Sequence, residues 1–172
     1  MLRKELPSLA EAEEAAELAA LAAILIYIWF RFEWPFAASA VVALTHDVIT
    51  TIGLFAITGL EFNLSTVAAL LTIAGYSIND TVVVFDRVRD NLRKYKSWSI
   101  PDILSLSLNE TLSRTIMTSL TTLIALVSIF LFGGAVLADF ALAMIWGVLI
   151  GTYSSIFVAV SALLFFDLTP ID

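Results

Sequence analysis

The sequence predicts an all-α fold, a polytopic membrane bundle of about five transmembrane helices. Hydrophobic residues make up 60% of the 172 residues and the mean hydropathy is +0.95, whereas only about half of a soluble domain is apolar. Three windows, 67–75, 120–132 and 140–166, carry almost no charge. Because a helix needs roughly 20 apolar residues to cross a bilayer, we expect these windows to lie in membrane spans and not in core strands.

Composition also excludes several classes of function. Cysteine is absent and there is a single histidine, His46, so thiolate redox chemistry, zinc sites and Cys–His or Ser–His–Asp catalysis have almost no residues to draw on. The formal net charge of -7 argues against nucleic-acid binding, which needs a basic surface. We expect no enzyme chemistry, metal or cofactor. A cleavable signal peptide is not expected either, because Pro7 and a run of glutamates follow Arg3 and Lys4.

Charged and turn-forming stretches divide the chain into five predicted helices. These helices cover residues 18–32, 36–57, 64–86, 111–132 and 139–166. The linker between the first two is short and includes Trp34, which is typical of a turn at the headgroup level. Residues 18–172 are therefore expected to form one transmembrane bundle in contact with the lipid bilayer.

The loops differ in basic residues, and this difference predicts the orientation. The linker after the third helix contains Arg87, Arg89, Arg93, Lys94 and Lys96. The loops around Glu61 and around Gly133 have no Lys or Arg. By the positive-inside rule the basic linker is cytoplasmic. Counting spans from it puts the C-terminus inside and the N-terminus, Glu61 and Asp139 outside.

A further helix is predicted within the basic linker. Ser99, Pro101 and Asp102 form a helix-start pattern. The apolar residues Ile103, Leu104, Leu106 and Leu108 follow. They indicate a short helix lying at the membrane interface, and a plain surface loop is the open alternative.

Residues 1–17 form an acidic lead-in that is rich in Ala and Glu. Ser8 and Glu11 have the spacing of a capping box, and the following residues have high helix propensity with acids in the early turns. We expect a helix that runs into the first span. So regular a stretch is typical of designed helices, and a natural or an engineered origin both remain open.

Polar residues inside the predicted spans are the main functional candidates. A charge in hydrocarbon costs at least about 2.5–3.5 kcal/mol, so each one needs a partner or a role. Asp80 lies about 9 Å inside the third helix and Arg114 about 7–8 Å inside the antiparallel fourth helix, which predicts an ion pair at one level. Four flanking polar residues are expected to satisfy their remaining hydrogen bonds. These are Asn79, Thr81, Asn109 and Ser113.

The Asp80–Arg114 pair has two readings. It could lock two helices together, although a buried pair is weak evidence for stability. It could also carry protons, because desolvation favours the protonated carboxyl whereas an adjacent Arg favours the ionised one. A proton on Asp80 would then leave Arg114 without its counter-charge, and the helices would move as Arg114 finds another partner. His46 and Asp47 lie about 15–16 Å into the second helix, near the bilayer midplane. They are either a second relay site or a satisfied part of the core, and a metal site made from these two alone is not expected.

The last predicted helix carries small residues at every fourth position. They are Ala143, Gly147, Gly151, Ser155 and Ala159. This ladder includes a GxxxG motif, which allows another backbone to approach closely in a membrane. It predicts tight helix packing and no chemistry.

Two segments of the predicted spans form distinctive motifs. Residues 75–87 read GYSINDTVVVFDR and residues 109–115 read NETLSRT. Both closely resemble the signatures of the SecF family of protein-export proteins. The segments 29–34 and 132–134 and the His46–Asp47 pair are also similar. The likeness covers about residues 24–166.

The resemblance implies membership of the SecD/SecF group of the resistance-nodulation-division superfamily, in the bacterial inner membrane. It also implies use of the proton gradient to help preproteins through the translocon, with a SecD-like subunit and SecYEG as partners. In that family the positions matched by Asp80 and Arg114 are implicated in proton transport.

The chain departs from the family pattern before residue 18. A full member has an additional first helix and a periplasmic domain, and here the Glu/Ala lead-in stands in their place. A truncated or redesigned export subunit is therefore expected. The alternative is a helical membrane scaffold without transport activity, and a small-molecule exporter of the same superfamily fits the motifs less well.

Overall fold

The computed structural model describes residues 33–59, 64–166 and 168, together with scattered residues between 12 and 30. Its helices are α2 (Trp34–Thr58), α3 (Leu64–Lys94), α4 (Ile100–Phe132), α5 (Ala135–Tyr153) and α6 (Ala159–Leu163), with a π-helical turn, η1 (Ser154–Val158), between the last two. No strand occurs in these residues. The predicted all-helical class is confirmed.

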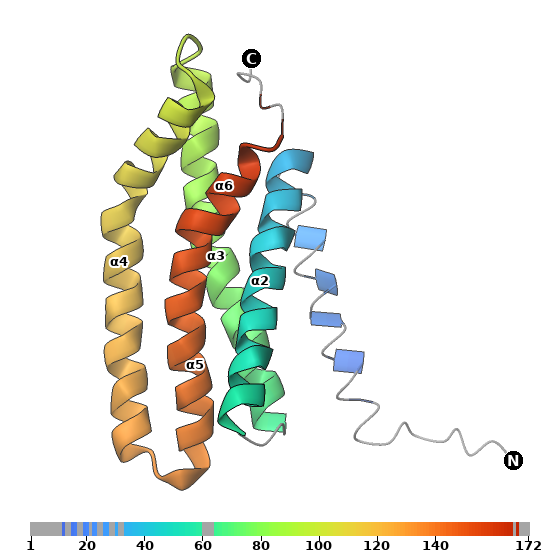
Figure 1. The fold of residues 1–172 in the computed structure, drawn as a ribbon, viewed down its shortest axis with the longest axis vertical. Helices are drawn as coiled ribbons and strands as arrows, with labels where there is room; N and C mark the ends of the chain where they lie inside the picture. The colour runs from blue at the N-terminus through green and yellow to red at the C-terminus, as the bar shows by residue number, and fades with distance from the viewer. Residues whose placement is uncertain are drawn as a thin grey trace, which may run out of the picture.

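The helices run antiparallel along one long axis (Figure 1). The α3–α4 loop and the end of α6 lie at one end of the bundle, and the α4–α5 loop lies at the other. The basic linker and the last helix end therefore share one side, as the span count predicts.

Four helices are long and apolar enough to cross a membrane. They span Trp34–Thr58, Ser65–Lys94, Ile100–Phe132 and Leu137–Leu163, matching the second to fifth predicted spans. The first predicted span, 18–32, and the lead-in, 1–17, fall largely outside the described residues. The fold agrees with a bundle of about five spans.

The hairpin between α3 and α4 differs from the prediction. Helix α3 continues to Lys94 instead of ending at Asp86, and α4 starts at Ile100. The helix start at Ser99 is confirmed, because the Ser99 hydroxyl accepts from the Asp102 backbone N–H. However, Ile103 and Leu104 belong to the first turns of α4 and not to a separate interfacial helix, since both are buried against the core instead of lying on a surface.

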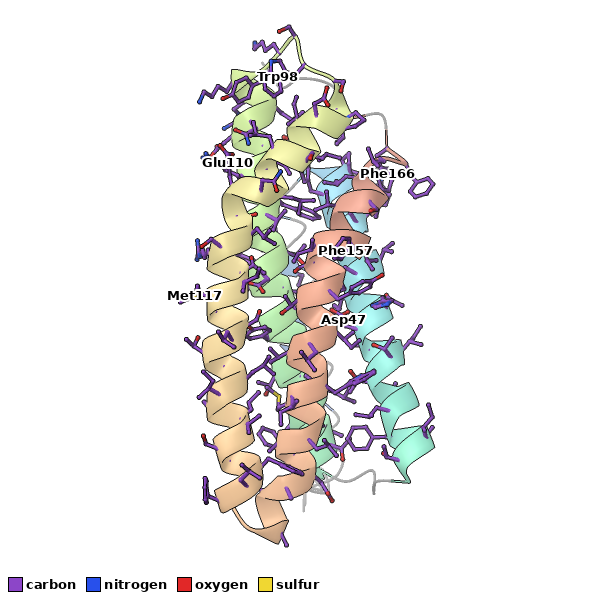
Figure 2. All side chains as sticks on the ribbon, turned by 60° about the vertical axis from the view of Figure 1, so that its left-hand side comes forward. Asp47, Trp98, Glu110, Met117, Phe157 and Phe166 are labelled. Carbon is purple, nitrogen blue, oxygen red and sulfur yellow. The ribbon has the colours of Figure 1, made fainter. Side chains whose placement is uncertain are left out.

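The apolar core is split into two clusters along the bundle axis. One contains Phe36, Phe85, Ile103 and Leu163 among others, and the second contains Phe55, Ile73, Met144 and Val148. Between them lies a layer of buried polar residues, namely Asp47, Thr51, Ser77, Ser154 and Ser155. A polar layer thus crosses the bundle between α2, α3 and η1, and Figure 2 shows Asp47 about midway between its two ends.

The last span is not one regular helix. It was predicted as residues 139–166, whereas the structure begins it at Ala135 and interrupts it with the π turn η1. A π turn holds one extra residue per turn and is frequent at functional sites. Here it coincides with the polar layer, because Ser154 and Ser155 are its first residues.

Candidate functional site

Asp47 is the centre of the polar layer. Its side chain is 0% exposed and its oxygen Oδ2 accepts hydrogen bonds from two hydroxyls, the Ser77 hydroxyl of α3 and the Ser154 hydroxyl of η1 at 2.7 Å. One carboxylate therefore joins three helical elements. A buried charge is tolerated when it is hydrogen-bonded in this way.

His46 supplies a third contact to this carboxylate. Its Nδ1 lies 3.1 Å from Asp47 Oδ1, and its side chain is one-third exposed. The imidazole ring also lies beside Tyr153, with 6.2 Å between ring centroids. The structure thus brings His46 and Asp47 together as a partly accessible pair, in which the imidazole reaches the surface and the carboxylate does not.

Asp80 has a different environment. It is 4% exposed, and its Oδ2 is a buried atom without a hydrogen-bond partner. Arg114 is exposed on α4, and the described contacts include no hydrogen bond or ion pair between the two side chains. Its charge is nevertheless near enough to act on the carboxylate. A direct ion pair is therefore not formed, and contact through one water stays a prediction.

The four residues expected to support this pair are not gathered around Asp80 Oδ2. Thr81 is buried, whereas Asn79, Asn109 and Ser113 are exposed. None of them donates to Asp80 Oδ2. The sequence motif therefore places polar groups at the right level, but helix rotation turns three of them outward.

The small-residue ladder lies against α3. A Cβ added at Gly147 would come 2.2 Å from Ile73 Cγ1, and one added at Gly151 would come 3.3 Å from Ser77 Cβ. The other three members, Ala143, Ser155 and Ala159, are fully buried. The absence of side chains at the two glycines lets α5 approach α3 closely, which brings η1 within reach of Asp47.

Two further polar networks were not anticipated from the sequence. On the membrane side of the hairpin, Tyr76 donates to Ser119 at 3.3 Å, and Ser119 lies 2.6 Å from Thr152. Nearer the α3–α4 loop, Glu110 accepts from Arg87 Nε at 2.6 Å and from Asn91 Nδ2 at 2.8 Å. Both networks join neighbouring helices, and the second explains why α3 and α4 stay helical beyond the predicted ends.

Sequence reasoning also missed Ser77 and Ser154. Ser77 stands inside the 75–87 motif, so the motif itself was a signal. Ser154 could not be chosen over its neighbour Ser155, because the π turn shifts the register of the helix. Within the described residues no group of three or more His, Asp or Glu side chains could hold a metal ion.

A family model decides which proteins this chain is related to. The model described as "Protein export membrane protein SecD/SecF, C-terminal" matches residues 7–168. The chain belongs to the SecD/SecF family. The match covers both buried aspartates and Arg114.

Two relatives described as "Protein translocase subunit SecF" are similar over most of this chain. The Rhodobacter capsulatus protein is 62% identical over 151 residues, covering 88% of this chain and 45% of the relative. The Cereibacter sphaeroides protein is 60% identical over 150 residues, covering 87% and 46%. The chain spans about half the length of these relatives and corresponds to a SecF membrane portion.

Solved structures agree with this assignment. A crystal structure of SecDF from Thermus thermophilus, described as a translocon-associated membrane protein, aligns with a TM-score of 0.84 and 46% identity over 88% of this chain and 21% of that chain. SecDF in a super-membrane-facing form aligns with a TM-score of 0.80 and 47% identity over 85% and 20%. With four apolar spans, this SecD/SecF member is a multi-pass protein of the bacterial inner membrane.

Proposed function

We propose that this chain is the membrane portion of a SecF-type translocase subunit, and that it uses the proton gradient to assist preprotein export. The observation that carries the proposal is the Asp80 carboxylate, which is buried within a candidate span with one oxygen lacking any hydrogen-bond partner. Burying such a group without a partner costs free energy. An intramembrane acid of this kind is by default a functional residue.

The arrangement around Asp80 suits reversible proton binding. With no donor on Oδ2, a proton can be added without breaking a hydrogen bond. Arg114 makes no direct contact with Asp80 among the described residues, and its positive charge attracts the carboxylate only while the carboxylate is ionised. When Asp80 is neutralised, Arg114 loses this attraction and its helix is free to repack, which converts a charge change into helix movement. Asp47 and His46 form a second candidate site in the same relay.

We propose a SecD-like subunit and the SecYEG translocon as partners, with a transport role rather than catalysis. The support is that the similar solved structures are of SecDF and that α4 leaves a large surface uncovered. Only 17% of its apolar window is buried, compared with 50% for the last span. Arg114 lies on this open helix, where a partner helix would cover it.

Proton flux in proteoliposomes tests the proposal. The chain is reconstituted with its SecD partner and Asp80→Asn is compared with Asp90→Asn, which removes an exposed acid from the same helix. We expect Asp80→Asn to abolish flux driven by an imposed pH gradient, while Asp90→Asn retains it. Equal flux in both variants would mean that Asp80 does not carry the proton, and no flux in the unmodified complex would favour the alternative of a helical scaffold without transport.

The proposed orientation is tested separately. The basic end of the bundle, with Lys94, is expected in the cytoplasm and Ala135 outside, because Lys and Arg are concentrated at the first of these ends. A cysteine at Ala135 should react with an impermeant maleimide added to intact spheroplasts, and one at Lys94 should not. The reverse labelling pattern would show that the bundle has the opposite orientation in the membrane.

A further inference from the structure

The Asp47 carboxylate and the π turn occupy the same place in the bundle. Ser154, the first residue of η1, donates to Asp47 Oδ2 at 2.7 Å, and Ser77 of α3 donates to the same oxygen. The carboxylate thus fixes the irregular turn of the last span to α2 and α3. Bonds to an ionised group are roughly twice as strong as neutral ones.

The Ser154 hydroxyl has a second acceptor within reach. The carbonyl oxygen of Gly151, three residues earlier, lies 3.2 Å from Ser154 Oγ. A hydroxyl carries a single proton and can donate to one acceptor at a time. Its choice between Oδ2 and the Gly151 carbonyl depends on whether Asp47 is charged.

We propose that Asp47 and Ser154 form a proton-controlled latch on the π turn of the last span. While Asp47 is ionised, Ser154 donates to it and the turn is held. When a hydronium ion transfers a proton to Oδ2 and leaves as water, the new O–H donates to Ser154 Oγ and the Ser154 hydroxyl turns to the Gly151 carbonyl. One O–H bond of hydronium is broken and one O–H bond on Oδ2 is formed. Every proton keeps an acceptor, and the link between α2 and the turn weakens from a charged bond to a neutral one.

The latch goes beyond the proposed function, because it needs a proton on Asp47 but no passage of protons across the membrane. Other titratable groups lie near Asp47 on the elements packed around it. Those within three residues of Asp47, Ser77 or Ser154 in the sequence are His46 on α2, Tyr76 and Asp80 on α3, and Tyr153 on α5. Neither η1 nor α6 contributes one, and the test must separate His46, which contacts the carboxylate directly.

Hydrogen exchange of residues 151–159, measured by mass spectrometry on the full chain in nanodiscs, tests the latch. Neighbouring Ser155 offers a matched control, since it is equally buried but donates to the Thr152 carbonyl at 3.0 Å. We expect the exchange rate of the unmodified protein, corrected for the intrinsic pH dependence of exchange, to rise about tenfold on acidification. This ratio corresponds to a loss of about 1.4 kcal/mol in the free energy of opening the turn. Ser154→Ala should already exchange fast at neutral pH and lose the pH response, whereas Ser155→Ala should behave like the unmodified protein.

Three results would overturn the latch. These are equal exchange in Ser154→Ala and Ser155→Ala, no response of the unmodified protein to acid, and loss of the response in His46→Gln, which would assign the switch to the imidazole. If Ser154→Ala does not fold, Ser154→Cys keeps the shape with a weaker donor and should show the same fast exchange. Proton flux is not a readout here, so the latch and the transport proposal can fail independently.

Discussion

Asp47 and Asp80 are the two acidic side chains buried among the described residues, and they differ in what surrounds them. Asp47 receives two hydroxyl donors on one oxygen and an imidazole nitrogen on the other. Asp80 has an oxygen with no partner, beside a helix that is largely uncovered. Both carboxylates lie in candidate spans, and the difference between them lies in the groups that contact each one.

The surroundings of Asp47 suit a group that holds helices together, whereas those of Asp80 suit a group that stays available for reaction. A carboxylate with all its donors in place joins helices, and its removal leaves other polar groups unsatisfied. A carboxylate without donors contributes little to packing and remains free to bind a proton. We call the surroundings of Asp47 the packed side and those of Asp80 the open side. The stability of the two sides is expected to respond differently to substitution.

The largest expected effect is on the packed side. Asp47→Ala should lower the free energy of unfolding by about 2–4 kcal/mol, because it leaves the buried Ser77 and Ser154 hydroxyls without their acceptor. Asp80→Asn should change it by less than about 1 kcal/mol, since no hydrogen bond to Oδ2 is lost. Unfolding in mixed micelles, followed by circular dichroism, measures both. Equal losses would remove the distinction between the two carboxylates.

A smaller effect is expected where α5 approaches α3. Gly147→Ala should destabilise the bundle by about 1–3 kcal/mol through overpacking, because the new methyl group would overlap Ile73. Gly53→Ala is the matched control, since it lies within α2 and its Cβ would meet nothing within 4 Å. That change should be neutral or stabilising by up to about 1 kcal/mol. If Gly147→Ala behaves like Gly53→Ala, the close approach is not required.

The open side is expected to show weaker coupling. A double-mutant cycle of Asp80→Asn and Arg114→Met should give an interaction energy of about 0.5–1 kcal/mol, because the charges act on one another without direct contact. The double variant should lose less stability than the sum of the single variants. Strictly additive effects would mean that the two residues do not form a unit.

The smallest effect is expected for Glu110, a carboxylate that is paired at the surface. Its partner Arg87 is 42% exposed, and exposed ion pairs contribute little to stability. Arg87→Met should therefore cost much less than Asp47→Ala, and the loss should shrink in high salt. Arg93→Met, at an exposed position six residues further along α3, is the control. A loss comparable with that of Asp47→Ala would show that the hairpin pair is more than a surface contact.

The fold was accessible from the sequence because membrane spans depend on composition and on charge position. The apolar windows and the motifs predicted the helical bundle and the family. Helix ends were harder to place, since α3 and α4 are prolonged by side chains that pair across the hairpin, Asn91 with Ser107 and Arg87 with Glu110. Such pairing depends on the approach of two helices, which local patterns do not encode.

The candidate site was only partly accessible. The cost of charge in hydrocarbon singled out Asp80, Arg114 and Asp47 from the sequence alone, and their roles stay predictions. The partners of Asp47 depend on the π turn, which moves Ser154 and not Ser155 against α2. The exposure of Arg114 depends on helix rotation, which depth counting along the chain does not provide.

Infrared difference spectroscopy during a pH jump tests the central claim most directly, because it detects the carbonyl stretch of a protonated carboxyl. If Asp80 exchanges a proton, the bundle in lipid gains and loses such bands reversibly, and one of these bands is missing in Asp80→Asn but present in Asp90→Asn. A spectrum of Asp80→Asn identical to that of the unmodified protein, or no carboxyl band at any pH at which the bundle stays folded, would contradict the claim that Asp80 exchanges a proton.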